Sequence, residues 1–290
     1  MISRKFTIWA CGLLFVFGSC AGDMVKPIEN DKDAPGTVQD VKTESLPGAV
    51  KFTYTLPSDP DLLYVLAKYT NKTGKVMEFR SSFYTNSVTV EGFGDTDTYK
   101  VELYTVDRSE NRSQPQIVEV VPLTPPILSC YESLSMVSDF GGMTFEMDNK
   151  FKSDLAIYVC TPDELGDMVL AETFYSAREE IVYSVRGYDA VPRRFGIFLQ
   201  DKYGNETDTL FTELTPIYER ELDKTKFREM YLQNDSRVDS YDGKMEYVWN
   251  GRISKDGDSG GVGLHTGTGT KDGPAVFTFD LGVLAKLSRF

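Results

Sequence analysis

The sequence contains a single histidine, His265, and none of its four cysteines forms a Cys-x-x-Cys pair. A hydrolase of the Ser-His-Asp type needs a histidine beside its nucleophile, and no nucleophile motif surrounds His265. Zinc sites need several thiolate or imidazole ligands at short spacing, so this shortage also argues against a zinc site. The absences favour a protein without a histidine-based active site.

Positive charge is scarce as well. The 31 Lys and Arg residues are outnumbered by 44 Asp and Glu residues, which gives a net charge of −13. A surface of this sign repels phosphate backbones, so we expect no nucleic-acid partner. Runs of strong helix formers are also missing, whereas aromatic residues make up 12% of the 290 residues. This composition favours strands, in a chain long enough for two or three domains.

The main apolar run stands at the N-terminus, in MISRKFTIWACGLLFVFGSCAGD. It follows a basic start and is too short to span a bilayer comfortably, so residues 1–19 are predicted to be a signal peptide. The small residues before Cys20 resemble a bacterial lipoprotein signal, although Phe17 stands where Leu is usual. That resemblance implies lipid attachment at Cys20; an ordinary cleaved leader is the alternative. Residues 20–34 are polar and predicted to be a flexible tether.

An internal repeat organises the middle of the chain. Four short signatures occur twice in the same order: ESL (Glu44–Leu46, Glu132–Leu134), VEGF/VRGY (Val90–Phe93, Val185–Tyr188), VDRSEN/QDKYGN (ending at Asn111 and Asn205) and LTP (Leu123–Pro125, Leu214–Pro216). We interpret them as two tandem domains, residues 35–124 and 125–218.

Each domain shows an all-β pattern. In VKFTYTL, Val50, Phe52 and Tyr54 alternate with polar residues, and similar short runs follow between Gly, Asp, Asn and Pro clusters. About seven strands with turns at this spacing predict a β-sandwich of the immunoglobulin or fibronectin type III kind. The Asp-x-x-x-Asn sequences after a late strand look like a fibronectin type III turn. We interpret these Asp and Asn residues as structural, because short polar side chains bond local backbone.

Two cysteines fall in the second predicted domain. Cys130 and Cys160 both stand in apolar contexts that are typical of strands. Export makes a disulfide chemically feasible, and two buried thiols are the other interpretation. The sequence leaves the choice open.

Residues 219–290 change pattern, with YVWNGRISKDGDSGGVGLHTGTGTKDGPAVFTFDLG at their centre. The order of Trp249 and Gly251, then His265 and Thr266, then Phe277–Gly282, resembles the front half of a discoidin-type, galactose-binding-like domain. The resemblance implies an incomplete jelly roll, because Asp-Leu-Gly normally leads into further strands and LAKLSRF looks like the first of them. We therefore expect residues 219–290 to be poorly stable alone, with most of the binding site beyond them.

Candidate binding residues in this segment are Trp249 and His265. Trp249 can act as an aromatic platform for a sugar ring or can pack in its loop, and His265 can be a ligand contact or a locally bonded loop residue. We expect no cofactor apart from calcium, for which the discoidin resemblance implies a site at the turn where Asn250 replaces the usual Asp. An Asn carbonyl can still bind calcium, with less charge.

The whole chain resembles a lipoprotein family of Bacteroidetes glycan-utilisation loci, through PGAVKFTYTLPSDPDLLYV, GFGDTDTYKVELYTVDRSENRS and LTPP. The resemblance implies a protein lipid-anchored to the outer membrane, displayed at the cell surface, that binds a glycan or polysaccharide without catalysis. The alternative is an assembly subunit that docks onto outer-membrane transporter components and has no sugar site. A polysaccharide-degrading enzyme is a third interpretation, but no catalytic scaffold such as a β/α barrel is recognisable.

Overall fold

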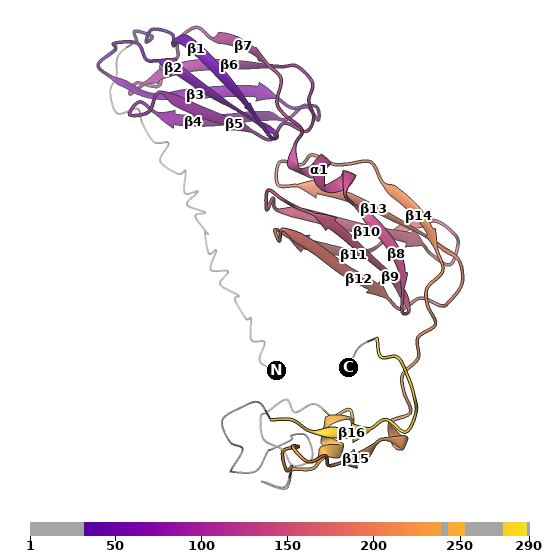
Figure 1. Cartoon of the computed structure of the whole chain (residues 1–290). Helices are drawn as coiled ribbons and strands as arrows, with labels where there is room; N and C mark the ends of the chain where they lie inside the picture. Colours follow the sequence, from indigo (N-terminus) through magenta and orange to yellow (C-terminus); the bar gives the residue numbers. More distant parts are fainter. Residues whose placement is uncertain (1–31, 239–242, 253–274, 289–290) are drawn as a thin grey trace, which may run out of the picture. The chain divides into compact units, whose positions relative to one another are not determined.

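The computed structural model describes residues 32–238, 243–252 and 275–288 (Figure 1). The signal peptide, Cys20 and His265 lie outside these residues. The chain divides into two compact units, Met1–Ser129 with Gln200–Thr207, and Cys130–Leu199 with Asp208–Phe290. Among the described residues, no helix has the length and apolar character needed to cross a membrane.

The first unit is a sandwich of two antiparallel sheets. One sheet has the order β1-β2-β5 and the other β4-β3-β6-β7 (Figure 1). The strands are β1 (Gln39–Leu46), β2 (Ala49–Thr55), β3 (Leu62–Thr70), β4 (Val76–Ser82), β5 (Ser87–Glu91), β6 (Tyr99–Asp107) and β7 (Gln116–Val120). The predicted alternation in β2 is confirmed, since Val50, Phe52 and Tyr54 are buried and the residues between them are exposed.

The second unit repeats this strand order. Its sheets are β8-β9-β12, which corresponds to β1-β2-β5, and β11-β10-β13-β14, which corresponds to β4-β3-β6-β7. The strands are β8 (Ser135–Asp139), β9 (Gly142–Asp148), β10 (Leu155–Pro162), β11 (Met168–Ser176), β12 (Glu180–Arg186), β13 (Arg193–Asp201) and β14 (Leu210–Leu214). Phe145, Ile157 and Phe195 are fully buried between its sheets. The prediction of an all-β chain with two tandem sandwiches is confirmed.

Each sandwich ends in the same arrangement of backbone hydrogen bonds, which we call the corner. In the first, the Gly48 amide donates to the Leu123 carbonyl at 3.0 Å, and the Phe93 amide donates to the Gly48 carbonyl at 3.1 Å. In the second, the Gly141 amide donates to the Ile217 carbonyl at 2.7 Å. Both glycines have left-handed φ angles, +60° and +64°, which side chains other than glycine adopt only with strain. The corner therefore bonds the connector after the last strand to the turn between the first two strands of each sandwich, and we refer to these bonds as the clip.

The two Asp-x-x-x-Asn turns are structural, as predicted. Asp107 is buried, and its Oδ1 accepts the amides of Ser109 at 2.8 Å and Asn111 at 2.9 Å. The Asn111 amide group donates to the Asp107 Oδ2 at 2.9 Å, and Asn205 does the same to Asp201 at 2.8 Å. Their oxygens therefore serve to close a loop.

The prediction that Cys130 lies in a strand is wrong, because it lies in the short helix α1 (Pro126–Glu132). Pro126 begins this helix, where its fixed φ suits the first turn and its missing N–H costs nothing. Cys130 is buried beside Asn149, with 3.6 Å between Sγ and Oδ1, whereas Cys160 is half-buried in β10. Both thiols are free.

After the second sandwich the structure is sparse. Its elements are the 3-10 helices η1 (Lys224–Lys226) and η2 (Met245–Val248) and the antiparallel pair β15 (Arg228–Met230) and β16 (Thr278–Asp280). The prediction of a further strand in LAKLSRF is wrong for the part described, because residues up to Ser288 form no strand. Leu284 there is fully exposed, and no strand among the described residues pairs with its run. A discoidin-like jelly roll stays a prediction.

Candidate functional site

A cavity of about 500 Å³ opens between η1, β15 and η2. It is lined by two aromatic side chains, by charged residues of both signs and by two buried apolar residues. The lining residues are Lys224, Thr225, Phe227, Arg228, Glu229, Val238, Gly243, Lys244, Met245, Glu246 and Trp249. We refer to it as the Trp249 pocket. An aromatic surface together with several polar groups is the usual make-up of a small-ligand site.

Trp249 is held in place by two other aromatic rings. Its ring centroid lies 5.0 Å from that of Phe279 on β16 and 5.7 Å from that of Phe227 between η1 and β15. Trp249 is half-buried, and Met245 on η2 is fully buried. The structure thus brings together Trp249 and the FTFDLG strand, which the sequence placed in one domain. Trp249 both packs and lines the pocket.

Charged side chains in and around the pocket are partly paired. The Lys224 Nζ lies 2.6 Å from the Glu221 Oε1, and this contact lowers the pKa of the exposed Glu221 carboxyl. The Lys244 Nζ lies 3.8 Å from the Glu246 Oε1. Exposed pairs such as these contribute little to stability, so their groups can reorient toward a ligand at little cost.

Glu229 has a different partner. Its Oε1 accepts a hydrogen bond from the Tyr231 hydroxyl at 2.6 Å. This bond raises the pKa of the Tyr231 hydroxyl, because ionising it would set two negative charges side by side. The hydroxyl therefore stays a donor at neutral pH and holds Glu229 at the edge of the pocket.

Asn250 follows Trp249 directly. Its Oδ1 accepts the backbone amide of Arg252 at 2.8 Å, and Gly251 between them has a left-handed φ of +73°. Within residues 32–238, 243–252 and 275–288, no group of three or more His, Cys, Asp or Glu side chains is arranged to hold a metal ion. Calcium needs several oxygen ligands, so the described residues do not by themselves fit one at Asn250. The calcium site stays a prediction without an assigned donor set.

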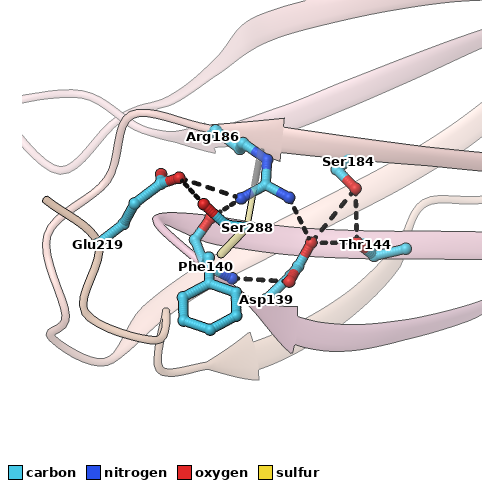
Figure 2. A network of polar contacts seen from close by, with 7 residues as sticks. All are labelled: Asp139, Phe140, Thr144, Ser184, Arg186, Glu219 and Ser288. Atoms are coloured by element: carbon cyan, nitrogen blue, oxygen red, sulfur yellow. Dashed lines mark hydrogen bonds and ion pairs between the residues drawn. The ribbon is translucent and has the colours of Figure 1, made fainter. Parts of the chain in front are cut away.

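A second polar cluster, which the sequence did not indicate, surrounds Arg186 at the end of β12 (Figure 2). The Arg186 Nη2 lies 2.9 Å from the Asp139 Oδ2, and its Nη1 donates to the Phe140 carbonyl at 2.7 Å. Nη1 also lies 3.5 Å from the Glu219 Oε1, which accepts a hydrogen bond from the Ser288 hydroxyl. Arg186 therefore links the sandwich to the segment that follows it.

Asp139 is ionised in this cluster. Burial favours its protonated form, but hydrogen bonds from the Thr144 hydroxyl and the Phe140 amide, with the charge of Arg186, lower the pKa of its carboxyl below the usual range. The Thr144 bond is 2.8 Å and that from the Ser184 hydroxyl is 3.3 Å. Its charged groups are paired with one another, and Asp139 accepts from two hydroxyls and an amide, so we assign the cluster a structural role.

Comparisons with known proteins match the two sandwiches. Residues 35–122 match the family described as Domain of unknown function (DUF4959), and residues 123–225 match Domain of unknown function (DUF5126). No curated protein matches the chain.

Several solved structures are similar to the chain. SusE-like protein BT2857 is 30% identical, with 56% of this chain and 57% of that chain covered and a TM-score of 0.35. A two-domain fibronectin type III segment of chicken tenascin is 12% identical, with 62% and 99% covered and a TM-score of 0.30. The FN1–FN3 domains of chicken CNTN1 are 10% identical, with 63% and 67% covered and a TM-score of 0.28. The chain thus spans little more than half the length of the SusE-like structure.

Proposed function

We propose that this chain is a non-enzymatic surface lipoprotein that captures polysaccharide through the segment after its second sandwich. In this proposal residues 35–124 and 125–218 are the two sandwich domains, and residues 219–290 begin a galactose-binding-like domain. The observation that carries the proposal is the Trp249 pocket, where an aromatic side chain lies among five charged residues.

The chemistry of the pocket suits a sugar. A pyranose ring has an apolar C–H face that packs on an indole, and its hydroxyls need donors and acceptors around the ring edge. Trp249 supplies the aromatic surface, while Lys224 and Lys244 donate and Glu246 accepts. Because Phe279 and Phe227 already hold the indole, little conformational freedom is lost when a ring binds to it.

Attachment to the membrane rests on Cys20 and the small residues before it. In the proposal Cys20 carries the lipid, and the polar residues after it separate the folded domains from the outer membrane.

The experiment measures retention of the detergent-solubilised full chain on a panel of immobilised polysaccharides by affinity electrophoresis. At least one polysaccharide should retard the wild type, and Trp249→Ala should lose most of that retardation. Trp249→Phe keeps an aromatic ring against Phe279 and should retain part of it. Tyr84→Ala is the matched control, because Tyr84 is an exposed aromatic residue of the first sandwich, 84% accessible. Failure of the wild type to bind any polysaccharide would count against the proposal.

A second function, docking onto an outer-membrane transporter component, is favoured by the β10–β11 hairpin. β11 is an edge strand, and apolar side chains are exposed along its first half and at the turn, including Leu165 at 87% and Leu170 at 56%. The matching edge strand of the first sandwich, β4, instead carries the charged residues Glu78 and Arg80. Charges protect an edge strand from pairing, whereas apolar residues leave it open to a partner.

Docking is tested by co-purification of the full chain with outer-membrane transporter proteins of its host. Leu170→Glu should abolish co-purification and leave polysaccharide retention unchanged. Val76→Glu, the same change on the exposed edge of β4, is the control. If Leu170→Glu and Val76→Glu both recover as much transporter as the wild type does, the hairpin is not the docking site.

A further inference from the structure

Three cations line the Trp249 pocket, and they differ in how their charge is balanced. Lys224 pairs with Glu221, and Lys244 pairs with Glu246. Arg228 has no such partner: within the described part of the chain, no carboxylate oxygen comes within the 4.0 Å of an ion pair. The pocket therefore contains one guanidinium whose charge no described side chain neutralises directly.

Arg228 is oriented by the backbone. It is the first residue of β15, and its Nη1 donates to the carbonyls of Thr225 and Phe227, both at 2.7 Å. No described residue accepts from Nη2 or Nε. Those two N–H groups form the edge of a guanidinium that binds a carboxylate through two parallel hydrogen bonds. The backbone contacts thus hold the fork in place and leave one side available.

The acidic residue nearest in register does not occupy this fork. Asp280 lies opposite Arg228 in the β15–β16 pair, but its Oδ1 accepts the Gly282 amide at 2.9 Å and forms no ion pair with Arg228. The net charge of −13 is spread over the whole chain. Charges farther than about 8 Å are largely screened at physiological salt, so an anion in the pocket is governed mainly by the charges that line it. These are the three cations and the carboxylates of Glu229 and Glu246, which leaves the lining with an excess of positive charge.

We propose that the Trp249 pocket binds an anionic sugar unit, with the acidic group on Arg228 and the ring on Trp249. The inference rests on the proposed function and adds the substrate class to it. A carboxylate or a sulfate could supply the charge, and the planar carboxylate of a uronate matches the fork in two bonds. A neutral glycan would leave the guanidinium without an anion.

The test compares polygalacturonate with fully methyl-esterified polygalacturonate, which has the same sugars without the charge, and with a sulfated galactan. Binding of the detergent-solubilised full chain is measured by titration calorimetry at physiological salt. The anionic polymer should bind at least about ten-fold more tightly than the ester. Arg228→Gln should remove that difference, and Arg228→Lys, which keeps the charge but loses the fork, should retain part of it.

Lys226→Gln is the control, because Lys226 is close by in η1, lies 4.0 Å from Asp223 and does not line the pocket. Arg228-dependent binding of the sulfated galactan alone also supports an anionic ligand and identifies sulfate as its source. If the methyl ester binds as tightly as polygalacturonate, or if Arg228→Gln and Arg228→Lys bind like wild type, the inference is overturned while polysaccharide capture stands. Binding to none of the polymers, neutral ones included, contradicts the proposed function itself.

Discussion

Replacing Arg186 by Ala tests the cluster that joins the second sandwich to the segment after it. The Arg186 side chain is 20% exposed, and its partners Asp139 and Glu219 are 26% and 16% exposed. Breaking a fully buried pair costs about 3–5 kcal/mol, and an exposed pair about 0–1 kcal/mol. Asp139 keeps its bonds from Thr144 and Ser184 after the substitution, so the loss should fall between these limits. We expect a decrease of about 2 kcal/mol in the free energy of unfolding.

The measurement is urea unfolding of the full chain at pH 7, with the transition of the second sandwich identified through Phe145→Ala. Arg80→Ala is the matched control, since Arg80 is 61% exposed and lies 3.7 Å from Glu78; it should lose less than about 0.5 kcal/mol. The reasoning is refuted if Arg186→Ala lowers the stability of the second sandwich by no more than Arg80→Ala lowers that of the first.

The same cluster predicts a pH dependence. The folded-state pKa of Asp139 is below its unfolded value of about 3.9, so its ionised form stabilises the fold above that pH. This stabilisation is lost as the pH falls through the folded pKa. Arg186→Ala raises that pKa, and the variant should therefore lose less stability than wild type between about pH 5 and pH 3. An unchanged acid slope would show that Arg186 does not act on Asp139.

Three further predictions concern other parts of the chain. Phe52→Ala removes a fully buried side chain from the first sandwich and should cost about 3–5 kcal/mol in urea unfolding; a loss under about 1 kcal/mol would mean that Phe52 is not a core residue. Burial raises the pKa of the Cys130 thiol to about 11, so iodoacetamide at about pH 8 should modify it only after urea unfolding; rapid labelling of the native protein at Cys130 would contradict this. Cys20→Ala should move the protein from the membrane fraction to the soluble fraction, and membrane association that persists would rule out a lipid at Cys20.

The strands of the sandwiches could be predicted where one face of the strand is buried and the other is exposed. The β2 strand alternates because one face meets the core and the other meets water, and this period is visible in the letters. The edge strand β11 gave no such signal, since its first five residues are exposed on both faces. In the short edge strand β7 only Val120 is buried, which is too little for a recognisable alternation. The helix α1 was missed because its seven residues are too few for a helical period.

The internal repeat was detected partly through coincidences of sequence. Glu44–Leu46 lies inside β1, whereas Glu132–Leu134 ends α1 and precedes β8, so this pair is not equivalent. The residue equivalent to Leu123 at the shared corner is Ile217, not Leu214. Structurally equivalent positions are defined by the hydrogen bonds of the corner, and short identical sequence motifs do not reveal these bonds.

The candidate site could be predicted only in part. The order of motifs in the sequence placed Trp249 and Phe279 in one domain, but it did not indicate that their rings meet in one aromatic cluster. No sequence pattern marked Arg228 as an anion-binding residue, because that role depends on no described carboxylate lying next to it in the folded chain. The link from Arg186 to Glu219 joins residues 33 positions apart, and many acidic residues in the sequence could have served equally well.

The clip at the end of the first sandwich also affects how the domain bears mechanical load. In the proposed function the protein holds a polymer and carries tension along its backbone. On the C-terminal side of this domain that tension would arrive at Leu123. The Leu123 amide donates to the Leu46 carbonyl at 3.1 Å, and its carbonyl accepts the Gly48 amide at 3.0 Å. Both bonds must break before β7 can peel away from β6. Ile217 is held in the same way in the second sandwich, so each domain extends from this side only after a two-bond latch has opened.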